Sequence, residues 1–188
     1  MENKLLKYTK KTPNEILNML NLKEPPFNPF DIANKMGINV LENIDWDKMG
    51  HDGEIYLDSH NNPEIWINPT LAPSRKNFTL AHELGHLVND VLPNLDKFKD
   101  PIYDDYSTLK RNGDRNPKEF IANRFASMLL MPKDILQTKG QEIINKYISD
   151  KPNEKMKFDV FLKVVSSKFE VSKDALRYRL INIGAIKE

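Results

Sequence analysis

Cysteine is absent from the 188 residues of this chain. Its absence excludes disulfide frameworks, thiol catalysis and cysteine-held zinc sites, so any metal ion must be bound by histidine, aspartate or glutamate. The sequence also lacks an apolar run approaching the roughly 20 residues of a membrane span, and its N-terminus lacks the apolar segment and cleavage site of a secretory signal. We therefore expect a soluble, cytoplasmic protein that makes no membrane contact.

Neither sign of charge dominates the composition. The 28 basic and 27 acidic residues give a formal net charge of +1, which provides no general attraction to nucleic acid or to anionic lipid. Repeats at the spacing of solenoids or propellers are missing as well, which excludes those architectures. The chain is long enough for one ordinary domain with a small appendage, and for a hydrophobic core that needs no covalent staples.

The first part of the chain alternates between helical and strand-like patterns. Apolar residues recur at helical spacing over residues 13–20 and 30–36, and Gly37 stands where a helix C-terminal cap is expected. Short apolar or period-two segments that predict strands follow at residues 38–41, 54–58 and 64–68. These patterns indicate an α+β fold in which a small antiparallel sheet packs on helices.

Two further helical patterns enclose a long polar segment. Ser74 is placed to cap the first of these helices. The apolar positions that recur along this helix are Phe78, Ala81, Leu84 and Leu87. Residues 91–117 have prolines near both ends and no regular period, which predicts an unusually long loop. The second helix is predicted over residues 118–131 and is ended by Pro132.

The C-terminal part of the sequence indicates a helical appendage. The polar residues 151–157 mark a predicted boundary, which divides the chain into a domain of residues 1–150 and an appendage of residues 151–188. Within the appendage, residues 158–169 and 173–183 carry apolar runs in the manner of a helix-turn-helix. Its basic character is weak, so we expect it to pack or to bind protein, and we do not expect it to bind nucleic acid directly.

A five-residue motif in the first of these helices predicts a metal site. Residues 82–86 read HELGH. His82 and His86 are four residues apart, so their imidazoles project from one face of a helix and reach a single ion. Glu83 lies about 100° round the helix from His82, where it can hydrogen-bond a water at the open coordination position without binding the metal itself. An amphipathic helix with two surface histidines is the alternative interpretation.

A catalytic zinc ion requires a third protein ligand and an open fourth position. Histidine does not recur after His86, so the third ligand should be a carboxylate. Asp90 lies on the same helical face as His86 but one turn too far along, at a helix end expected to fray. Glu119 is favoured because it begins a helix beside apolar residues, where a metal would compensate the cost of burying its charge. The alternative is that Glu119 only provides a favourable acid at a helix N-terminus.

With these residues assembled, two segments resemble the ImmA/IrrE family of metallo-endopeptidases. The first is RKNFTLAHELGH at residues 75–86, and the second is EFIANRFASMLLMP at residues 119–132. The resemblance runs from about residue 30 to about residue 135, and residues 169–180 also resemble a segment that these proteins carry near the C-terminus. Residues 91–117 are longer and more charged than the family pattern, so their role, as a lid or an exosite, is open.

The resemblance implies roles for individual residues and a class of substrate. His82, His86 and Glu119 match the zinc ligands of the family. Glu83 matches its catalytic acid/base, and Asn123 matches a residue that braces one of the ligands. The resemblance also implies a thermolysin-like core and a zinc-dependent endopeptidase. Its implied substrate is a regulatory protein, typically a helix-turn-helix repressor of a mobile element or stress response.

Some functional details stay open at this level. The side chain that would stabilise an oxyanion is undetermined among His51, Tyr103 and Tyr106. The strand around Trp66 is a candidate for aligning an extended substrate, although tryptophan in such a strand is more often part of the core. A zinc-containing regulator that binds a repressor or DNA without proteolysis is the alternative function, and mutation of Glu83 to Gln separates it from a peptidase.

Overall fold

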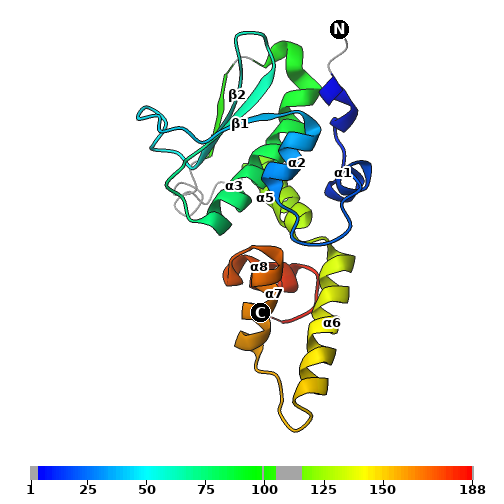
Figure 1. Ribbon diagram of the computed structural model, residues 1–188. Helices are drawn as coiled ribbons and strands as arrows, with labels where there is room; N and C mark the ends of the chain where they lie inside the picture. The colour runs from blue at the N-terminus through cyan, green and yellow to red at the C-terminus, as the bar shows by residue number, and fades with distance from the viewer. Residues whose placement is uncertain (1–3, 99, 105–115, 188) are drawn as a thin grey trace.

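Helix α3 (Pro73–His86) is the centre of the fold. The computed structural model describes residues 4–98, 100–104 and 116–187 (Figure 1). Helix α3 contacts strands of the sheet and also crosses α5 (Pro117–Leu130), with which it makes the most extensive helix contact of the described residues. The fold is therefore α+β, as predicted, and the HELGH motif lies between the sheet and a second helix.

The sheet has four short strands, and their pairing differs from the predicted one. They are β1 (Asn39–Leu41), β2 (Gly53–Leu57), β3 (Pro63–Ile67) and β4 (Ile102–Asp104), in the spatial order β1-β3-β2-β4. β2 pairs antiparallel with β3 and β4, but β1 pairs parallel with β3, so the expected antiparallel sheet is in fact mixed. Apolar alternation specifies the faces of a strand and not its neighbours. The long connection of residues 42–52 carries the chain past β3 before β2 begins.

The N-terminal segment forms helices that pack around α3, α5 and the segment that follows α3. These are the 3-10 helix η1 (Lys4–Tyr8), α1 (Pro13–Met19) and α2 (Pro29–Met36). Thr12 and Glu15 form a reciprocal capping box at the beginning of α1. Helix α2 ends at Gly37, which has a φ of 87°, a left-handed conformation that glycine adopts without steric cost. The predicted cap at this position is therefore confirmed.

The beginning of α3 differs from the prediction. The N-cap is Ala72 and Pro73 occupies the first turn, so Ser74 lies inside the helix and does not cap it. Proline is favoured in the first turn because its fixed φ suits a helix and its missing N–H would have no helical partner there.

The segment predicted as a long loop is structured in part. Beyond His86 the helical path continues through the π-helix η2 (Leu87–Val91) and the 3-10 helix η3 (Leu92–Lys97). Strand β4 then adds to the edge of the sheet by pairing with β2. The loop prediction is wrong for these residues because main-chain pairing needs no apolar period. Residues 105–115 lie outside the described part of the chain.

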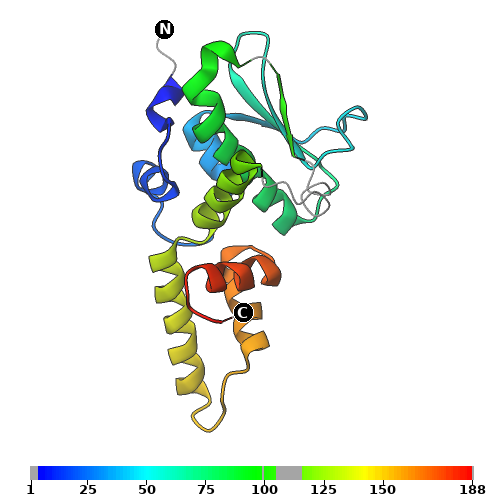
Figure 2. The same ribbon diagram turned by 180° about the vertical axis from the view of Figure 1, so that it is seen from behind.

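The last three helices extend away from the sheet, as two opposite views show (Figures 1 and 2). They are α6 (Lys133–Asp150), α7 (Phe158–Phe169) and α8 (Lys173–Asn182), and α7 packs against both α6 and α8. The two predicted C-terminal helices are thus present. Among the described helices, none combines the length and the apolar character needed to cross a membrane.

Apolar contacts link the C-terminal helices to the rest of the protein. One hydrophobic cluster includes buried residues of α3, α5, α7 and α8. The rings of Phe27 and Phe169 lie 6.5 Å apart, and Arg179 Nε donates a hydrogen bond of 2.9 Å to the carbonyl of Met131 at the end of α5. The division of the chain at residue 150 stays a prediction.

Candidate metal centre

A glycine in the HELGH motif allows α3 and α5 to approach closely. A Cβ atom at Gly85 would lie 3.0 Å from Ala122 Cα and 3.2 Å from Ala122 O. Both are backbone atoms, so they move only if the whole of α5 moves. Since Glu119 is one helical turn before Ala122, the close crossing brings its carboxylate to the two histidines of α3.

Three side chains of these helices converge on one point. In the described part of the chain, His82, His86 and Glu119 form a cluster whose candidate ligand atoms all lie within 4.8 Å of one another. The Nε2 atoms of the two histidines are 3.0 Å apart. Glu119 Oε2 lies 3.1 Å from His82 Nε2, and Glu119 Oε1 lies 3.3 Å from His86 Nε2. The structure therefore brings together the three predicted ligands.

These separations fit a tetrahedral metal ion. Zinc binds histidine nitrogen and carboxylate oxygen at about 2.0–2.1 Å, so neighbouring ligand atoms of a tetrahedral site lie about 3.3 Å apart. The observed separations of 3.0–3.3 Å approach this value. Three ligands of this type leave a fourth position open, as in catalytic zinc sites.

Hydrogen bonds at the opposite ring nitrogens fix the orientation of both histidines. His82 Nδ1 donates to Asn123 Oδ1 over 3.1 Å, and His86 Nδ1 donates to Asp90 Oδ2 over 2.9 Å. With Nδ1 engaged in this way, Nε2 is the ring nitrogen that is available to a metal ion, and in both histidines it faces Glu119. Metal-binding histidines are usually held in this way. Asn123 thus lies where the family resemblance places a bracing residue.

The position of Asp90 is not predicted by the sequence, which places this residue at a fraying helix end. Instead the helix continues through η2, and Asp90 contacts the ring nitrogen of His86 that faces away from Glu119. The available signal was the four-residue spacing from His86, which places Asp90 one turn further along the same face.

The pKa values of His86 and Glu119 are shifted in opposite directions by their contacts with each other. Burial opposes protonation of His86, but hydrogen bonds to the carboxylates of Asp90 and Glu119 outweigh it, and together with the charge of Glu83 they raise its pKa to about 10. For Glu119, burial raises the pKa, but hydrogen bonds to His82 and His86 lower it to about 2. A divalent cation satisfies the same field when it replaces the imidazole proton.

Glu83 lies on the side of α3 that faces the sheet. Its side chain is fully buried, and Gly53, the first residue of β2, lies against it. A Cβ atom at Gly53 would lie 2.9 Å from Glu83 Oε1 and 2.6 Å from Thr79 Cγ2. Gly53 is therefore required where the main chain of β2 covers the carboxylate, and this wall separates Glu83 from solvent.

His51, Tyr103 and Tyr106 are the residues considered from the sequence as oxyanion donors. His51 lies in the turn before β2, where its carbonyl accepts a hydrogen bond of 3.1 Å from Asn68 Nδ2. Tyr103 lies in β4 opposite Glu54 of β2. Tyr106 lies outside the described residues. The source of an oxyanion donor among these three residues stays a prediction.

The suggestion that the strand around Trp66 aligns a substrate is wrong. β3 lies between β1 and β2, so both of its edges are already paired. Trp66 is 1% exposed, and its Nε1 donates a hydrogen bond of 3.0 Å to the carbonyl of Asn43. Strand addition requires a free edge. The residue is part of the packing on the outer face of the sheet.

Comparisons with known proteins agree with the geometry. The Peptidase_M78 family model, described as the IrrE N-terminal-like domain, matches residues 33–181. The curated proteins include no match. A solved structure described as a Mycobacterium tuberculosis transcriptional regulator has a TM-score of 0.50 and 13% sequence identity, covering 96% of this chain and 47% of that one.

The solved structure is informative about the fold alone, because its identity to this chain is low. This chain also spans about half of its length. The family match includes the HELGH motif, Glu119, α7 and all of α8 except Asn182. It confirms the resemblance drawn from the two motifs, and the chain belongs to the Peptidase_M78 family of IrrE N-terminal-like domains.

Proposed function

We propose that this chain is a zinc-dependent endopeptidase that hydrolyses a peptide bond in a regulatory protein. The observation that carries the proposal is the convergence of His82, His86 and Glu119 within 3.3 Å, next to the buried carboxylate of Glu83. The proposed zinc ligands are those three residues. A helix-turn-helix repressor is the proposed substrate, which would make the protein an anti-repressor in a mobile element or stress response.

The donor set suits zinc and its chemistry. Two imidazoles and one carboxylate form a common set of ligands in zinc peptidases, and a zinc ion bound by them acts as a Lewis acid that activates water and polarises a carbonyl group. The chain contributes the alignment: Asn123 and Asp90 hold the two imidazoles so that both Nε2 atoms face the same point. This preorganisation avoids a rearrangement during catalysis.

Glu83 is the proposed general base and acid. Its carboxylate takes a proton from the water whose oxygen attacks the carbonyl carbon of the substrate. When the bond between that carbon and the amide nitrogen breaks, Glu83 returns the proton to the nitrogen, which leaves as an amine. The wall formed by Gly53 and β2 excludes bulk water from the carboxylate, so the proton stays available for the leaving group.

The two comparisons support different parts of the proposal. The family match supports a peptidase. The fold is also shared with a chain described as a transcriptional regulator, which is compatible with a role in transcriptional control. The identity of the repressor and of the cleaved bond lies beyond both comparisons.

Metal content and cleavage together test the proposal. We expect the purified protein to contain one equivalent of zinc, and expect His82→Ala and Glu119→Ala to lose it. Glu83→Gln should keep the metal and lose cleavage of a co-purified repressor, because the ligands are unchanged and only the base is removed. If Glu83→Gln releases the repressor from its operator as well as the native protein does, the chain acts by sequestration and the peptidase proposal fails.

A further inference from the structure

Among the residues that the structure describes, the most exposed large apolar side chain lies in the connection between β1 and β2. This connection, the Trp46 loop (residues 42–52), contains Trp46, which is 81% exposed, and Ile44, which is 63% exposed. The other tryptophan, Trp66, is buried. An exposed tryptophan next to a second exposed apolar residue is typical of protein contact sites, where tryptophan is enriched among the residues that dominate binding.

The loop is held in place at both ends, so that the exposed residues are presented on a fixed support. Each of its anchors is a hydrogen bond or ion pair with the sheet, with Asn68 directly after β3, or with α3. The anchors are Trp66 Nε1 to Asn43 O (3.0 Å), Lys76 to Glu42 (2.7 Å), Lys48 to Glu54 (3.2 Å), Asn68 Nδ2 to His51 O (3.1 Å) and Arg75 Nε to Asp52 (2.9 Å). A support that is ordered before binding lowers the entropic cost of association.

The charged residues near Trp46 favour a partner with basic side chains. Glu42 and Asp52 are neutralised by cations of α3, whereas Asp45 and Asp47, on either side of Trp46, form no ion pair with any residue that the structure describes. Asp45 Oδ1 accepts a hydrogen bond of 3.1 Å from the Asp47 N–H, and the remaining carboxylate oxygens of this turn have no ion-pair partner in the described chain. An exposed indole with an aspartate on each side in the sequence suits a guanidinium group, which stacks on aromatic rings and hydrogen-bonds to carboxylates. The same charges repel acidic peptides and anionic lipid.

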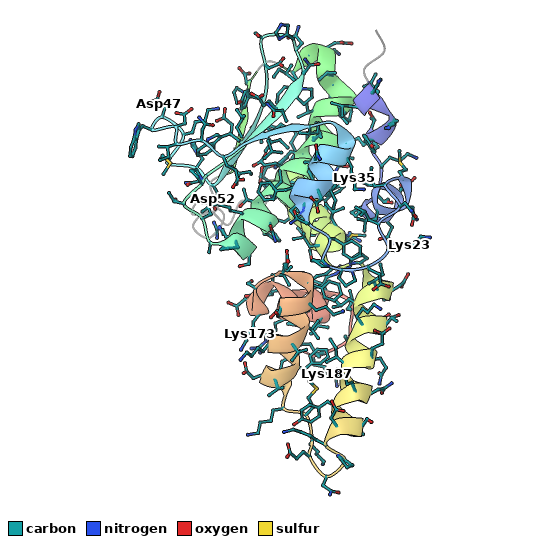
Figure 3. All side chains as sticks on the ribbon, viewed as in Figure 1. Lys23, Lys35, Asp47, Asp52, Lys173 and Lys187 are labelled. Atoms are coloured by element: carbon teal, nitrogen blue, oxygen red, sulfur yellow. The ribbon has the colours of Figure 1, made fainter. Side chains whose placement is uncertain are left out.

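The loop also leads directly to the proposed active site. Asp52 is followed by Gly53, whose backbone covers Glu83. Figure 3 shows Asp47 at the outer edge of the molecule and Asp52 where the loop returns toward α3. The Trp46 loop therefore continues directly into the strand that covers the proposed general base.

We propose that the Trp46 loop is a docking site for a segment of the protein substrate that carries arginine beside apolar side chains. The proposal deepens the proposed function, because it assigns the docked segment to a substrate. The binding itself needs neither metal nor hydrolysis, since Asp45, Trp46 and Asp47 lie outside the ligand cluster.

Binding of a synthetic peptide of alternating arginine and leucine tests the proposal. The measurement uses fluorescence anisotropy of the labelled peptide with the full-length Glu83→Gln protein, and a peptide with glutamate in place of arginine is the control. We expect the arginine peptide alone to bind and to shield Trp46 from a fluorescence quencher. Trp46→Ala should weaken binding at least about tenfold, and Asp45→Asn with Asp47→Asn should reduce both the affinity and its dependence on salt.

Tyr178→Ala is the matched control, because Tyr178 is 69% exposed on α8 and distant in sequence from the loop. It should bind the arginine peptide as the parent protein does. Equal binding of both peptides, or unchanged binding by Trp46→Ala, would overturn the proposal. So would self-association of the parent protein that Trp46→Ala abolishes, because the occupant would then be a second copy. Failure of docking leaves the zinc content unaffected, so it is distinguishable from failure of the peptidase proposal.

Discussion

His86 and His82 are held by different kinds of acceptor. The Nδ1 atom of His86 donates to a carboxylate, that of Asp90, whereas Nδ1 of His82 donates to the amide oxygen of Asn123. A carboxylate acceptor makes the imidazole more basic and a stronger metal ligand than an amide does. At the scale of single residues, we therefore expect His86 to contribute more to metal affinity, with Asp90 as its positioning residue.

Removing the charge of Asp90 tests this difference. Asp90→Asn should lower the pKa of His86 from about 10, because one of the carboxylates that raise it is lost. The zinc affinity should fall about 10-fold to 100-fold while the fold is preserved. The two measurements are a histidine NMR titration of metal-free protein and competition with a chelator. Asp96→Asn, which changes an exposed aspartate in η3, should alter neither quantity.

The pH dependence of zinc binding follows from the same residue. In metal-free protein the pKa of His86 rises from 6.5 to about 10, so its protonation stabilises the fold fully below about 6.5 and this contribution is lost as the pH rises through 10. Zinc must displace that proton. Its affinity should therefore increase about tenfold per pH unit between pH 6.5 and 8.5, measured against a chelator of known protonation. An affinity independent of pH in this range would contradict the account.

Glu119 has the opposite dependence. Its pKa is lowered from 4.5 to about 2, so its charge stabilises the cluster above about 4.5 and this contribution is lost as the pH falls through 2. In metal-free protein, this group should make the free energy of unfolding larger at pH 5 than at pH 3. We expect Glu119→Gln, which removes the charge, to abolish that part of the difference. Denaturant unfolding at the two pH values measures it.

At the scale of secondary structure, periodicity predicted elements better than it predicted their partners. The helices that begin at Pro13 and Pro117 and the strands β2 and β3 lie within a few residues of the predicted segments. The parallel pairing of β1, the edge strand β4 and the π-helix η2 were not predicted. These three features are formed by main-chain hydrogen bonds, which any order of apolar residues allows. Apolar periodicity therefore could not predict them.

Gly85 and Gly140 form a matched pair for testing the crossing of α3 and α5. A Cβ at Gly85 meets backbone atoms of Ala122 at 3.0 Å and 3.2 Å, whereas a Cβ at Gly140 of α6 meets the Phe161 ring at 3.4 Å. Gly85→Ala should cost about 1–3 kcal/mol of unfolding free energy and weaken zinc binding, because α5 must shift. Gly140→Ala should be neutral or stabilising by up to about 1 kcal/mol. Denaturant unfolding and zinc titration of both variants provide the comparison.

Gly53→Ala tests the wall that β2 forms over Glu83. The new methyl group would lie 2.6 Å from Thr79 Cγ2 and 2.9 Å from Glu83 Oε1, so either the strand or the carboxylate must move. We expect a large loss of peptidase activity with the zinc content retained, because the ligands converge at Glu119 of α5 and the new methyl group meets none of them. Adding Thr79→Ser removes the contacting methyl group of Thr79 and should restore part of the activity. Full activity of Gly53→Ala alone would show that the wall is dispensable.

At the scale of the whole molecule, the C-terminal helices and the metal-binding helix are connected. Arg179 of α8 is 8% exposed and donates to the carbonyl of Met131, the C-cap of α5, which also carries Glu119 and Asn123. Burial of the guanidinium group and the nearby charge of Arg124 lower the pKa of Arg179. The position of α5 thus depends in part on packing contributed by a segment that the sequence indicated as an appendage.

Loss of the hydrogen bond from Arg179 should lower the free energy of unfolding. Arg179→Met keeps much of the side-chain volume but leaves the carbonyl of Met131 without this donor, which should cost about 1–3 kcal/mol. Arg177→Met, at an exposed position of the same helix, should cost less than about 0.5 kcal/mol. Equal losses for the two variants in urea unfolding would show that the buried contact is unimportant.

The sequence predicted the three candidate ligands, but it did not predict that Gly53 lies against Glu83 or that Asp90 orients His86. The four-residue spacing of His82 and His86 is local, and Glu119 was recognisable from its apolar neighbours and the family resemblance. The contact between Gly53 and Glu83 joins residues distant in the chain, and no local pattern encodes it. The same is true of the close crossing at Gly85, which depends on the approach of α5.

The central claim is that two neighbouring helices bind one zinc ion through His82, His86 and Glu119. A crystal structure of the zinc-loaded protein, with diffraction data collected at the zinc absorption edge, tests it most directly. We predict one anomalous peak within about 2.0–2.2 Å of both Nε2 atoms and of a Glu119 carboxylate oxygen. A peak elsewhere, or a Glu119 carboxylate turned away from both imidazoles, would contradict the account.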